Sequence, residues 1–359
     1  MFVRNAWYVA TDPTELAERS IIARRILDER IVIFRTESGG LAALEDACPH
    51  RKAPLSLGRI AGETIQCGYH GAAFGVDGRC TSIPGQSLIP RGAQVRSYPI
   101  QERHGFIWIW TGDPERAGDE SSIPETFSVG AHPDYRGGHG LFESLKTNYR
   151  LLNDNLFDIT HAEYVHPESF GGAEVRFYRN AHRGTEPIDR GLSFNIKDKS
   201  IHFRTYAASL GDEGAPLWRN MMAAARGLNG WTEPLDFKME VNWLAPCYTS
   251  FHIYMRPAGQ PDAPAVEFHN LHAAIPETAS STHYFYCSLQ NYGDGEATAR
   301  FLQGARFIHG QDVAILEGQQ EVVGKDDVLD LDHVSFKGDK LQLEGRRILE
   351  RMILEEQRA

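Results

Sequence analysis

The sequence predicts an α+β protein with two domains. An all-β domain is expected over residues 1–112, and a larger domain, with helices gripping a curved antiparallel sheet, over residues 113–359. Three observations support this prediction. The chain has 359 residues, which is enough for two domains and allows a third. A connector rich in Pro, Gly and Asp runs from Gly112 to Pro124. Strand-like segments precede this connector, whereas both strands and long helices follow it.

The strands expected in the first domain are short and apolar. Ile31–Arg35 and Leu41–Glu45 flank the turn Ser38-Gly39-Gly40, and together they predict a β-hairpin. Two further strands are expected over Val95–Ile100 and Phe106–Trp110.

In the second domain, apolar and polar residues alternate with period two over several segments, which predicts strands. These segments are Leu192–Ile196, Ile201–Ala207, Lys238–Leu244, Ser250–Met255, Phe268–Ile275 and Ser281–Leu289. Helical patterns cover Leu145–Leu152, Glu296–Glu321 and Leu341–Gln357. Helices packed on a sheet leave room for a ligand cavity between the two layers.

The composition excludes some classes of partner. The net charge of −11 and the pI of about 5.8 argue against nucleic acid and anionic membranes, which attract basic surfaces. Apolar runs such as Gly105–Trp110 are much shorter than the roughly 20 residues that span a bilayer. Because the N-terminus lacks a signal-peptide pattern, we expect a cytoplasmic protein. Five cysteines do not suggest a disulfide framework.

Two loops of the first domain carry a strong metal-binding pattern. Each offers one cysteine and one histidine, Cys48 with His50 and Cys67 with His70. Two thiolates and two imidazoles suit either a tetrahedral zinc ion or a two-iron, two-sulfur cluster with mixed ligation. A zinc finger normally groups cysteine with cysteine and histidine with histidine. The alternation therefore favours the cluster, with both cysteines on one iron and both histidines on the other. Cys80, Cys247 and Cys287 have no such pattern and are expected to be packing residues.

A second candidate metal site lies in the stretch Asn153–His166, which holds two histidines, two aspartates and two asparagines. Neutral imidazoles this close in sequence suggest a metal that takes a third ligand from elsewhere. However, positions five apart on an ideal helix point about 140° apart. His161 and His166 can therefore share a metal only if the helix ends or bulges between them. The alternative is two surface histidines at the end of an amphipathic helix.

These motifs resemble a known family. Cys48–Gly58 and Cys67–Cys80 resemble the cluster loops of a Rieske domain. With Asn153–His166, nearly the whole chain resembles the terminal oxygenase components of Rieske non-haem iron oxygenases. The start of the chain and its length are most similar to the α-only branch that contains vanillate and dicamba O-demethylases and toluenesulfonate methyl-monooxygenase. Ala72 and Gly75 depart from the residues that many members have, Trp and Asp, but neither position binds the cluster.

The resemblance implies a Rieske [2Fe-2S] domain followed by a helix-grip catalytic domain that binds a mononuclear Fe(II). In the family, this iron is held by two histidines and one carboxylate. The histidines correspond to His161 and His166, and the carboxylate to Asp312, with Glu317 as the competing choice. Three protein ligands leave positions open for dioxygen and substrate.

The resemblance also assigns residues near the iron. Asp158 would accept the second imidazole proton of His161 and contact His70 of a neighbouring subunit, so that electrons pass from the cluster to the iron. This arrangement implies a homotrimer with head-to-tail contacts. Asn155 (or Asn153) would lie close to the iron, although an asparagine packed at a helix bend is an equal alternative.

Residues that contact the substrate are harder to identify from sequence. His272 matches a position that contacts the carboxylate-bearing substrate of the dicamba enzyme, and Gln303 stands where that enzyme has an aromatic residue. Trp231 belongs to a stretch that can form a pocket wall or lid. The few polar residues suit a small aromatic substrate with one anionic group.

The expected activity is that of an oxygenase component in a multicomponent monooxygenase. Electrons from NAD(P)H would arrive through a separate reductase or ferredoxin, and the substrate would be hydroxylated or, at O- or N-methyl groups, demethylated. Aromatic ring dioxygenation, by cis-dihydroxylation or with decarboxylation, uses the same metals and is the alternative reaction. Two hypotheses of a non-catalytic function are also kept as alternatives: a Rieske electron carrier and a metal-stabilised binding protein.

Overall fold

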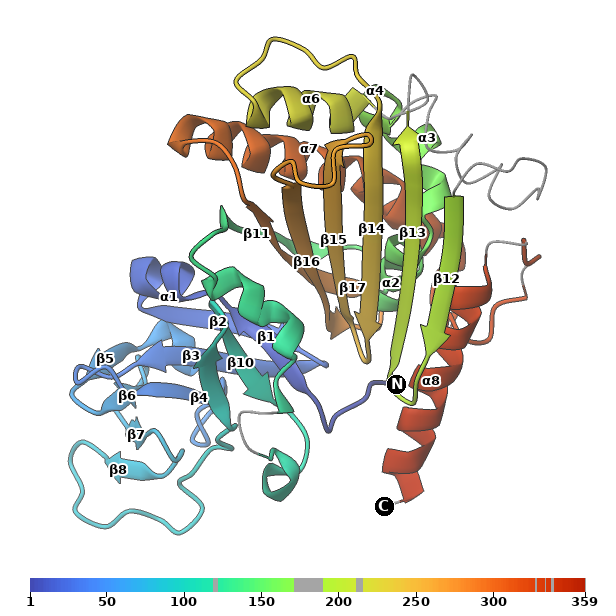
Figure 1. The fold of residues 1–359 in the computed structure, drawn as a ribbon. Coiled ribbons are helices and arrows are strands. Elements are labelled where there is room, and N and C mark those ends of the chain that lie inside the picture. Colours follow the sequence, from blue (N-terminus) through green and yellow to red (C-terminus); the bar gives the residue numbers. More distant parts are fainter. Residues whose placement is uncertain are drawn as a thin grey trace. The chain divides into compact units, whose positions relative to one another are not determined.

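The structure, a computed structural model, describes residues 1–118, 122–170, 190–210, 216–326, 328–332, 334–336 and 339–358 (Figure 1). It divides into two units. The first holds Met1–Ser128, with Ile275–Ala279 and the end of the chain, and the second holds Val129–Ala274 and Ser280–Gln357. No helix among the described residues is long and apolar enough to cross a membrane.

Small antiparallel sheets make up the first unit, as the sequence predicts. Their orders are β1-β10-β9, β2-β3-β4 and β5-β6-β7-β8. The strands are β1 Trp7–Thr11, β2 Ile21–Ile26, β3 Glu29–Arg35, β4 Leu41–Glu45, β5 Arg59–Ala61, β6 Thr64–Gln66, β7 Ala73–Gly75, β8 Cys80–Ser82, β9 Ile100–Arg103 and β10 Phe106–Trp110. Helical segments are α1 Pro13–Arg19 and the 3₁₀ turns η1 Leu55–Leu57, η2 Pro114–Arg116 and η4 Glu125–Ala131. The predicted hairpin, β3 and β4, and the strand β10 are confirmed.

The strand expected over Val95–Ile100 is wrong. Within this segment an isolated bridge forms at Ser97, and β9 begins at Ile100. Pro99 offers no N–H for a continuous ladder. The apolar residues of this segment serve the core instead, since Val95 and Tyr98 are both buried.

The segment that follows β10 packs on the first unit. The indole N–H of Trp7 donates to the carbonyl oxygen of Ala117 at 3.1 Å and to Ser122 Oγ at 2.8 Å. The ring of Phe127 lies 5.2 Å from that of Trp108. The unit therefore continues to Ser128, beyond residue 112, where the sequence places the domain boundary. The limits of the functional domains stay a prediction.

The second unit is built on a seven-stranded antiparallel sheet in the order β11-β17-β16-β15-β14-β13-β12. The strands are β11 Arg136–Leu145, β12 Arg190–Ile196, β13 Ser200–Leu210, β14 Leu235–Leu244, β15 Tyr248–Pro257, β16 Val266–Thr278 and β17 Ser281–Gln290. The helices are α2 Tyr149–Phe157, α3 Ala162–Val165, α4 Pro167–Phe170, α6 Pro216–Ala225, α7 Gly295–Val323 and α8 Lys340–Arg358, with the 3₁₀ turn η5 Ile159–His161. Helices and an antiparallel sheet together confirm the α+β class.

Several boundaries in this unit follow from single residues. The helix expected over Leu145–Leu152 begins instead at Tyr149, because Asn148 caps it by accepting a bond from the N–H of Arg150 at 2.9 Å. Strand β16 continues through Pro276, beyond the end of its pairing with β15 at Ala273. All of the predicted strands and the two long C-terminal helices are confirmed.

The two faces of the sheet have different roles. Alternate residues of β14 are buried, and Figure 1 shows α2 and α7 behind the strands in this view. Phe251 and Ile253 of β15 and Phe268 of β16 line a cavity on the helix-covered face. The residues between them, such as His252 and His269, point to the opposite, outer face because side chains alternate along a strand.

Candidate metal centres and substrate cavity

The two cysteine–histidine loops are closed by the same pattern of main-chain hydrogen bonds. In each, the cysteine N–H donates to the carbonyl five residues later, and the N–H four residues later donates to the cysteine carbonyl, at 2.8 to 3.0 Å. The donor in that second bond has a positive φ in both loops, 55° at Lys52 and 77° at Gly71. The repeated geometry presents Cys48 and Cys67 in equivalent positions.

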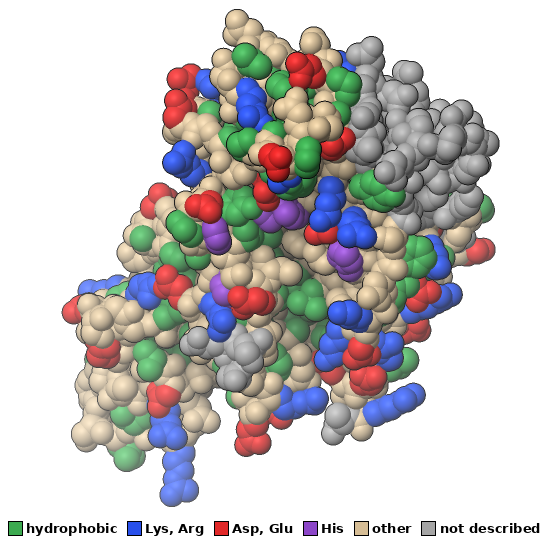
Figure 2. Space-filling model, in the orientation of Figure 1, with side chains coloured by type: hydrophobic (Ala, Val, Ile, Leu, Met, Phe, Trp, Pro, Cys, Tyr) green, Lys and Arg blue, Asp and Glu red, His purple; other side chains and the backbone are tan. Residues whose placement is uncertain are grey.

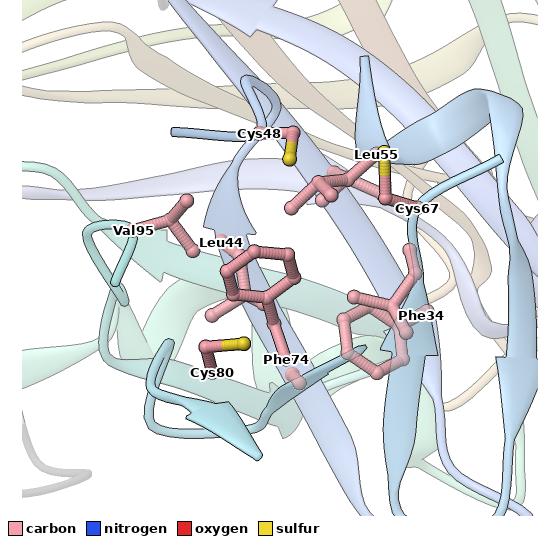
Figure 3. Close-up of a cluster of buried hydrophobic side chains, with 11 residues drawn as sticks. Phe34, Leu44, Cys48, Leu55, Cys67, Phe74, Cys80 and Val95 are labelled. Atoms are coloured by element: carbon pink, nitrogen blue, oxygen red, sulfur yellow. The ribbon is translucent and has the colours of Figure 1, made fainter. Parts of the chain in front are cut away.

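The thiols and imidazoles of these loops lie at different depths. Cys48 and Cys67 are each 3% exposed and belong to a buried apolar cluster that includes Phe34, Leu55 and Phe74 (Figure 3). The imidazoles of His50 and His70 are exposed, with ring centroids 4.6 Å apart. One pair of ligands therefore faces the core and the other faces solvent, which suits a group with two metal ions of different ligation.

The distances between the ligand atoms of these four residues also distinguish a two-iron cluster from a single metal ion. Among the described residues, two sets of three or more metal-ligating side chains bring their ligand atoms within 4.8 Å of one another, and the four loop residues are not one of them. Burial raises the pKa of the Cys48 thiol, and the neighbouring Cys67 raises it further, as expected where a positive group is needed to hold two thiolates together. The residues fit a [2Fe-2S] cluster better than one zinc ion.

The loop glycines fit their surroundings tightly. A Cβ on Gly68 would lie 2.7 Å from the carbonyl oxygen of Leu57. All five cysteines are buried, and none forms a disulfide in the structure.

His161, His166 and Asp312 come together in the second unit, although 146 positions separate His166 from Asp312 along the chain. Asp312 Oδ1 lies 3.3 Å from Nε2 of His161 and 3.3 Å from Nε2 of His166. Two atoms that each bind one ion at about 2.1 Å are roughly 3.0–3.4 Å apart at tetrahedral or octahedral angles. The three side chains therefore fit one metal ion.

The helix ends between the two histidines, as their spacing requires. α2 ends before Asp158, a 3₁₀ turn carries His161, and α3 ends at Val165. His166 follows with φ −120° and ψ 55°, outside helical geometry. This break turns both imidazoles towards Asp312 and confirms the prediction made from the five-residue spacing.

Each histidine is oriented by a partner on its other ring nitrogen. His161 Nδ1 donates to the main-chain carbonyl of Asp158, and His166 Nδ1 donates to Gln311 Oε1 at 2.9 Å. Both Nε2 atoms are therefore left as acceptors that can bind a metal. Asn155 Nδ2 donates to Asp312 Oδ1 at 3.1 Å and fixes the third ligand.

The role expected for the Asp158 side chain needs a correction. Its main-chain carbonyl, and not its carboxylate, accepts the imidazole proton of His161. The carboxylate instead caps the 3₁₀ turn, since Asp158 Oδ1 accepts from the N–H of Thr160 at 2.8 Å and from its hydroxyl. Asp158, Asp339 and Arg346 also line a pocket next to His161.

The electrostatics of the triad favour a cation. Burial by itself would raise the pKa of Asp312, but the hydrogen bonds and charges of His161 and His166 hold it well below its usual range. Burial would lower the pKa of His161, yet Asp312 raises it overall. In the absence of metal, the Asp312 carboxylate and a protonated His161 thus stabilise each other, and a divalent ion would take the place of the imidazole proton.

Glu317, the competing third ligand, lies elsewhere. Glu317 Oε1 accepts from the main-chain N–H of Lys146 at 3.0 Å. The buried side chains of α7 recur every three or four residues, and the positions concerned are Ala305, His309, Asp312, Leu316 and Gln320. Glu317 is not part of this buried stripe, whereas Asp312 is.

A cavity of about 120 Å³ adjoins the triad. Its wall is mostly apolar, and the larger side chains are those of Phe170, Trp218, Met239, Phe251, Ile253, Phe268 and Ile308. Engineered apolar cavities of about 150 Å³ hold benzene, so this space suits one aromatic ring. A second cavity of about 240 Å³ shares Phe170, Phe268 and Ile308 with it and extends the available room.

Few polar groups reach this cavity. His272 is 2% exposed, with Nδ1 lying 2.7 Å from the hydroxyl of Tyr284, and burial holds its pKa well below the usual value. Burial also lowers the pKa of His309 to about 4. His309 Nδ1 and Asn270 Oδ1 are buried atoms that have no hydrogen-bond partner within the described part of the chain. Both can bind a polar group on a substrate.

The other two candidate substrate residues lie apart from this wall. Gln303 is exposed on α7, and the indole N–H of Trp231 donates to the carbonyl of Glu233 at 2.8 Å. Neither is among the described residues that line the cavity. Sequence reasoning missed Gln311, His309 and Asn270, although His309 lies one helical turn before Asp312 and thus on the same helix face.

Comparison with known proteins agrees with both centres. The Rieske [2Fe-2S] domain family matches residues 6–99, and the vanillate O-demethylase oxygenase C-terminal domain family matches residues 145–355. A putative toluene-4-sulfonate monooxygenase system iron-sulfur subunit from Comamonas testosteroni is 34% identical over 98% of this chain and 97% of its own length. The dicamba O-demethylase oxygenase component of Stenotrophomonas maltophilia is 37% identical over 81% of this chain and 79% of its own.

Solved structures show the same fold. Dicamba monooxygenase bound to 3,6-dichlorosalicylic acid superposes with a TM-score of 0.83 at 31% identity, covering 99% of this chain and 98% of that one. The fold and its two candidate metal sites define a two-domain iron oxygenase. The chain belongs to the Rieske non-haem iron oxygenases, in the branch with the vanillate O-demethylase oxygenase C-terminal domain. Members of this family bind a [2Fe-2S] cluster and a mononuclear iron.

Proposed function

We propose that this chain is the oxygenase component of a monooxygenase that hydroxylates a small aromatic substrate and removes its O- or N-methyl group by oxidation. The observation that carries this proposal is a triad of two histidines and one carboxylate, open to an apolar cavity sized for one aromatic ring. Hydroxylation of a methyl group on oxygen or nitrogen gives an unstable product that releases formaldehyde and the demethylated compound.

The proposed metal-binding roles follow from the two sets of residues. Residues 1–112 would bind the cluster through Cys48, His50, Cys67 and His70, and residues 113–359 would bind the iron through His161, His166 and Asp312. When bound, the iron supplies dioxygen activation, with electrons from the cluster. The chain itself orients the imidazoles and keeps water away from the substrate ring.

Substrate recognition would combine shape with a few polar contacts. The apolar wall accepts the ring, and His272 is the proposed contact for an anionic group. Asn270 and His309 add polar atoms without partners in the described part of the chain, and these support a substrate with a carboxylate or hydroxyl. Gln303 and Trp231 do not line this cavity, so their proposed contacts with the substrate have less structural support.

We place the electron route between subunits. Asp158 would link His161, through its main-chain carbonyl, to His70 of a neighbouring subunit, through its carboxylate, in a homotrimer. Asn155 would hold the iron carboxylate in place. The pocket lined by Asp158, His161 and Arg346 supports this proposal because it adjoins both the candidate iron ligand and the proposed linking residue. A separate reductase or ferredoxin would deliver electrons from NAD(P)H, in the cytoplasm. This partner is inferred from relatives named as oxygenase components.

Product analysis under ¹⁸O₂ tests the reaction. The purified chain would be combined with a surrogate reductase and screened against methoxylated and carboxylated aromatic compounds. We expect one labelled oxygen atom in a product that is hydroxylated and stable. With methoxy substrates, the labelled atom leaves in formaldehyde, which must be trapped before it exchanges with water and should equal the demethylated product in amount. Two labelled atoms on the ring would instead establish aromatic ring dioxygenation. A colourless protein that binds zinc in place of iron would overturn the enzymatic proposal.

The electron route predicts the behaviour of one variant. Asp158→Asn keeps the shape of the side chain and its capping bond, but removes the negative charge between the two metal sites. We expect the cluster and iron contents to stay at wild-type levels while turnover with reductase falls by about 100-fold. Full activity in this variant would show that electrons take another path.

A further inference from the structure

A second group of metal-ligating side chains lies on the outer face of the large sheet, opposite the iron cavity. It consists of His252 on β15 and of Glu267 and His269 on β16. His252 and His269 are direct cross-strand neighbours, and Glu267 lies two residues before His269 on the same face. In Figure 2, histidine side chains reach the surface over these strands, among charged residues.

The ligand atoms of this group already lie close together. One ligand atom from each of the three residues lies within 4.8 Å of the others, the same criterion that the iron triad meets. His252 Nε2 is 2.8 Å from Glu267 Oε2. The rings of His252 and His269 stack with centroids 4.1 Å apart and planes 11° apart, so their nitrogens lie close together and the rings must tilt towards one shared ion.

One ligand atom is left without a protein partner. His269 Nε2 is buried and has no hydrogen bond within the described part of the chain. A buried polar atom without a partner costs free energy that a bound ion would recover. Burial lowers the pKa of His269 to about 4, so its imidazole is neutral at pH 7 and can act as a ligand.

The carboxylate of the group is held by a further residue. The hydroxyl of Tyr135 donates to Glu267 Oε2 at 3.0 Å, and its ring meets that of His269 edge-on at 4.7 Å. Side chains that hydrogen-bond a metal ligand in this way fix its orientation. The site is also reachable from solvent, because the side chains of His252 and Glu267 are 30% and 21% exposed.

We propose that His252, Glu267 and His269 form a second metal site that binds a divalent cation of intermediate softness, with Zn²⁺ as the best fit. Two imidazoles and one carboxylate are ligands that zinc takes in proteins, and water supplies the fourth position. A hard ion such as Mg²⁺ prefers oxygen ligands and does not suit two imidazoles. The site joins two strands to the segment before β11 and does not depend on the reaction at the iron.

Zinc titration of the full-length protein, with cluster and iron in place, tests this proposal. The protein would be titrated anaerobically with Zn²⁺ by calorimetry, and zinc and iron contents would be measured afterwards. We expect one zinc ion per chain to bind without loss of iron. His252→Ala combined with His269→Ala should abolish that binding, and Tyr135→Phe should weaken it by about 10- to 100-fold.

His202→Ala provides the matched control, since His202 lies on β13 in the same sheet and is partly exposed but is not in the group. It should bind zinc as the wild type does. The proposal is overturned if the wild type takes up zinc only as iron is lost, or if the double variant binds zinc with wild-type affinity. Far-ultraviolet circular dichroism shows whether each variant is folded.

Discussion

At the scale of single residues, the proposed iron site consists of candidate ligands and of the groups that orient them. The ligands carry recognisable residue types, so the histidines are visible in the sequence. Their orienting partners are a main-chain carbonyl at Asp158 and an amide at Gln311. Neither has a sequence signature, because any residue provides a carbonyl and glutamine is common on helix surfaces.

Gln311 gives the first prediction at this scale. Gln311→Leu removes the acceptor that orients His166 while it keeps the size of the side chain. We expect the affinity for Fe(II) to fall by about 10- to 100-fold, because the imidazole loses its fixed tautomer. Iron content after dialysis against graded chelator measures the effect. The cluster absorption should not change, and an unchanged iron affinity would contradict this role of Gln311.

The pH dependence of iron binding gives the second prediction at this scale. Asp312 raises the pKa of His161 above its usual value despite burial. In the iron-free protein, protonated His161 therefore stabilises the fold below pH 6.5, the ordinary value, and this contribution is lost as pH rises through the raised pKa. Iron needs the neutral imidazole, so its affinity should fall about tenfold per pH unit below the raised pKa. Fe(II) titrations from pH 6 to 9 measure this slope, and a flat profile would contradict it.

At the scale of elements, β11 shows how tertiary contacts override local preference. Its sequence, Arg136 to Leu145, holds three glycines and has poor strand propensity. It forms a strand because it pairs with β17 along most of its length. Its glycines are required by close approach. A Cβ on Gly137 would lie 1.8 Å from the carbonyl of Ser288, and one on Gly140 would lie 2.0 Å from the ring of Tyr286.

A pair of glycine substitutions tests this explanation. Gly140→Ala should lower the free energy of unfolding of the second unit by about 1–3 kcal/mol, because the methyl group overlaps buried Tyr286. Gly318→Ala is the control on α7. Nothing lies within 4 Å of its added Cβ, so it should stabilise the helix by up to about 1 kcal/mol. Urea unfolding followed by tryptophan fluorescence compares the two variants. Equal effects would show that close packing does not determine the choice of glycine.

Helix α8 illustrates a second long-range dependence at this scale. Arg346 donates to the carboxylate of Asp154, at 3.0 Å from its Nε, and both side chains are largely buried. Gly345 lies against Phe157, where an added Cβ would be 3.0 Å from the ring. The last helix thus fastens the end of α2, the helix that leads to His161.

At the scale of the whole molecule, two units hold two different sets of candidate metal ligands. The thiols and imidazoles of the cluster loops belong to the first unit, and the histidine–carboxylate triad belongs to the second. Electron transfer must connect them, and the proposed homotrimer would do so between neighbouring subunits.

Complementation between two inactive variants tests this route. Cys67→Ser should lose the cluster, and His161→Ala should lose the iron, so each variant alone should be inactive. Co-expressed chains should form mixed oligomers that recover activity, because a cluster in one chain serves the iron in the next. Native mass spectrometry should show species of three times the 40.2 kDa of one chain. Mixed trimers without activity would place the electron route within a single chain.

The sequence alone predicted the α+β class, the long helices, most strands and the residue types of the candidate metal ligands. These follow from local periodicity and from the few residue types that bind metals. The tertiary structure decided what depends on contacts distant in the chain. It placed Asp312 rather than Glu317 beside the histidines, because only Asp312 lies on the buried stripe of α7. Pairing with β17 makes β11 a strand despite its glycines, and a main-chain carbonyl orients His161. The register between β15 and β16 brings His252, Glu267 and His269 together.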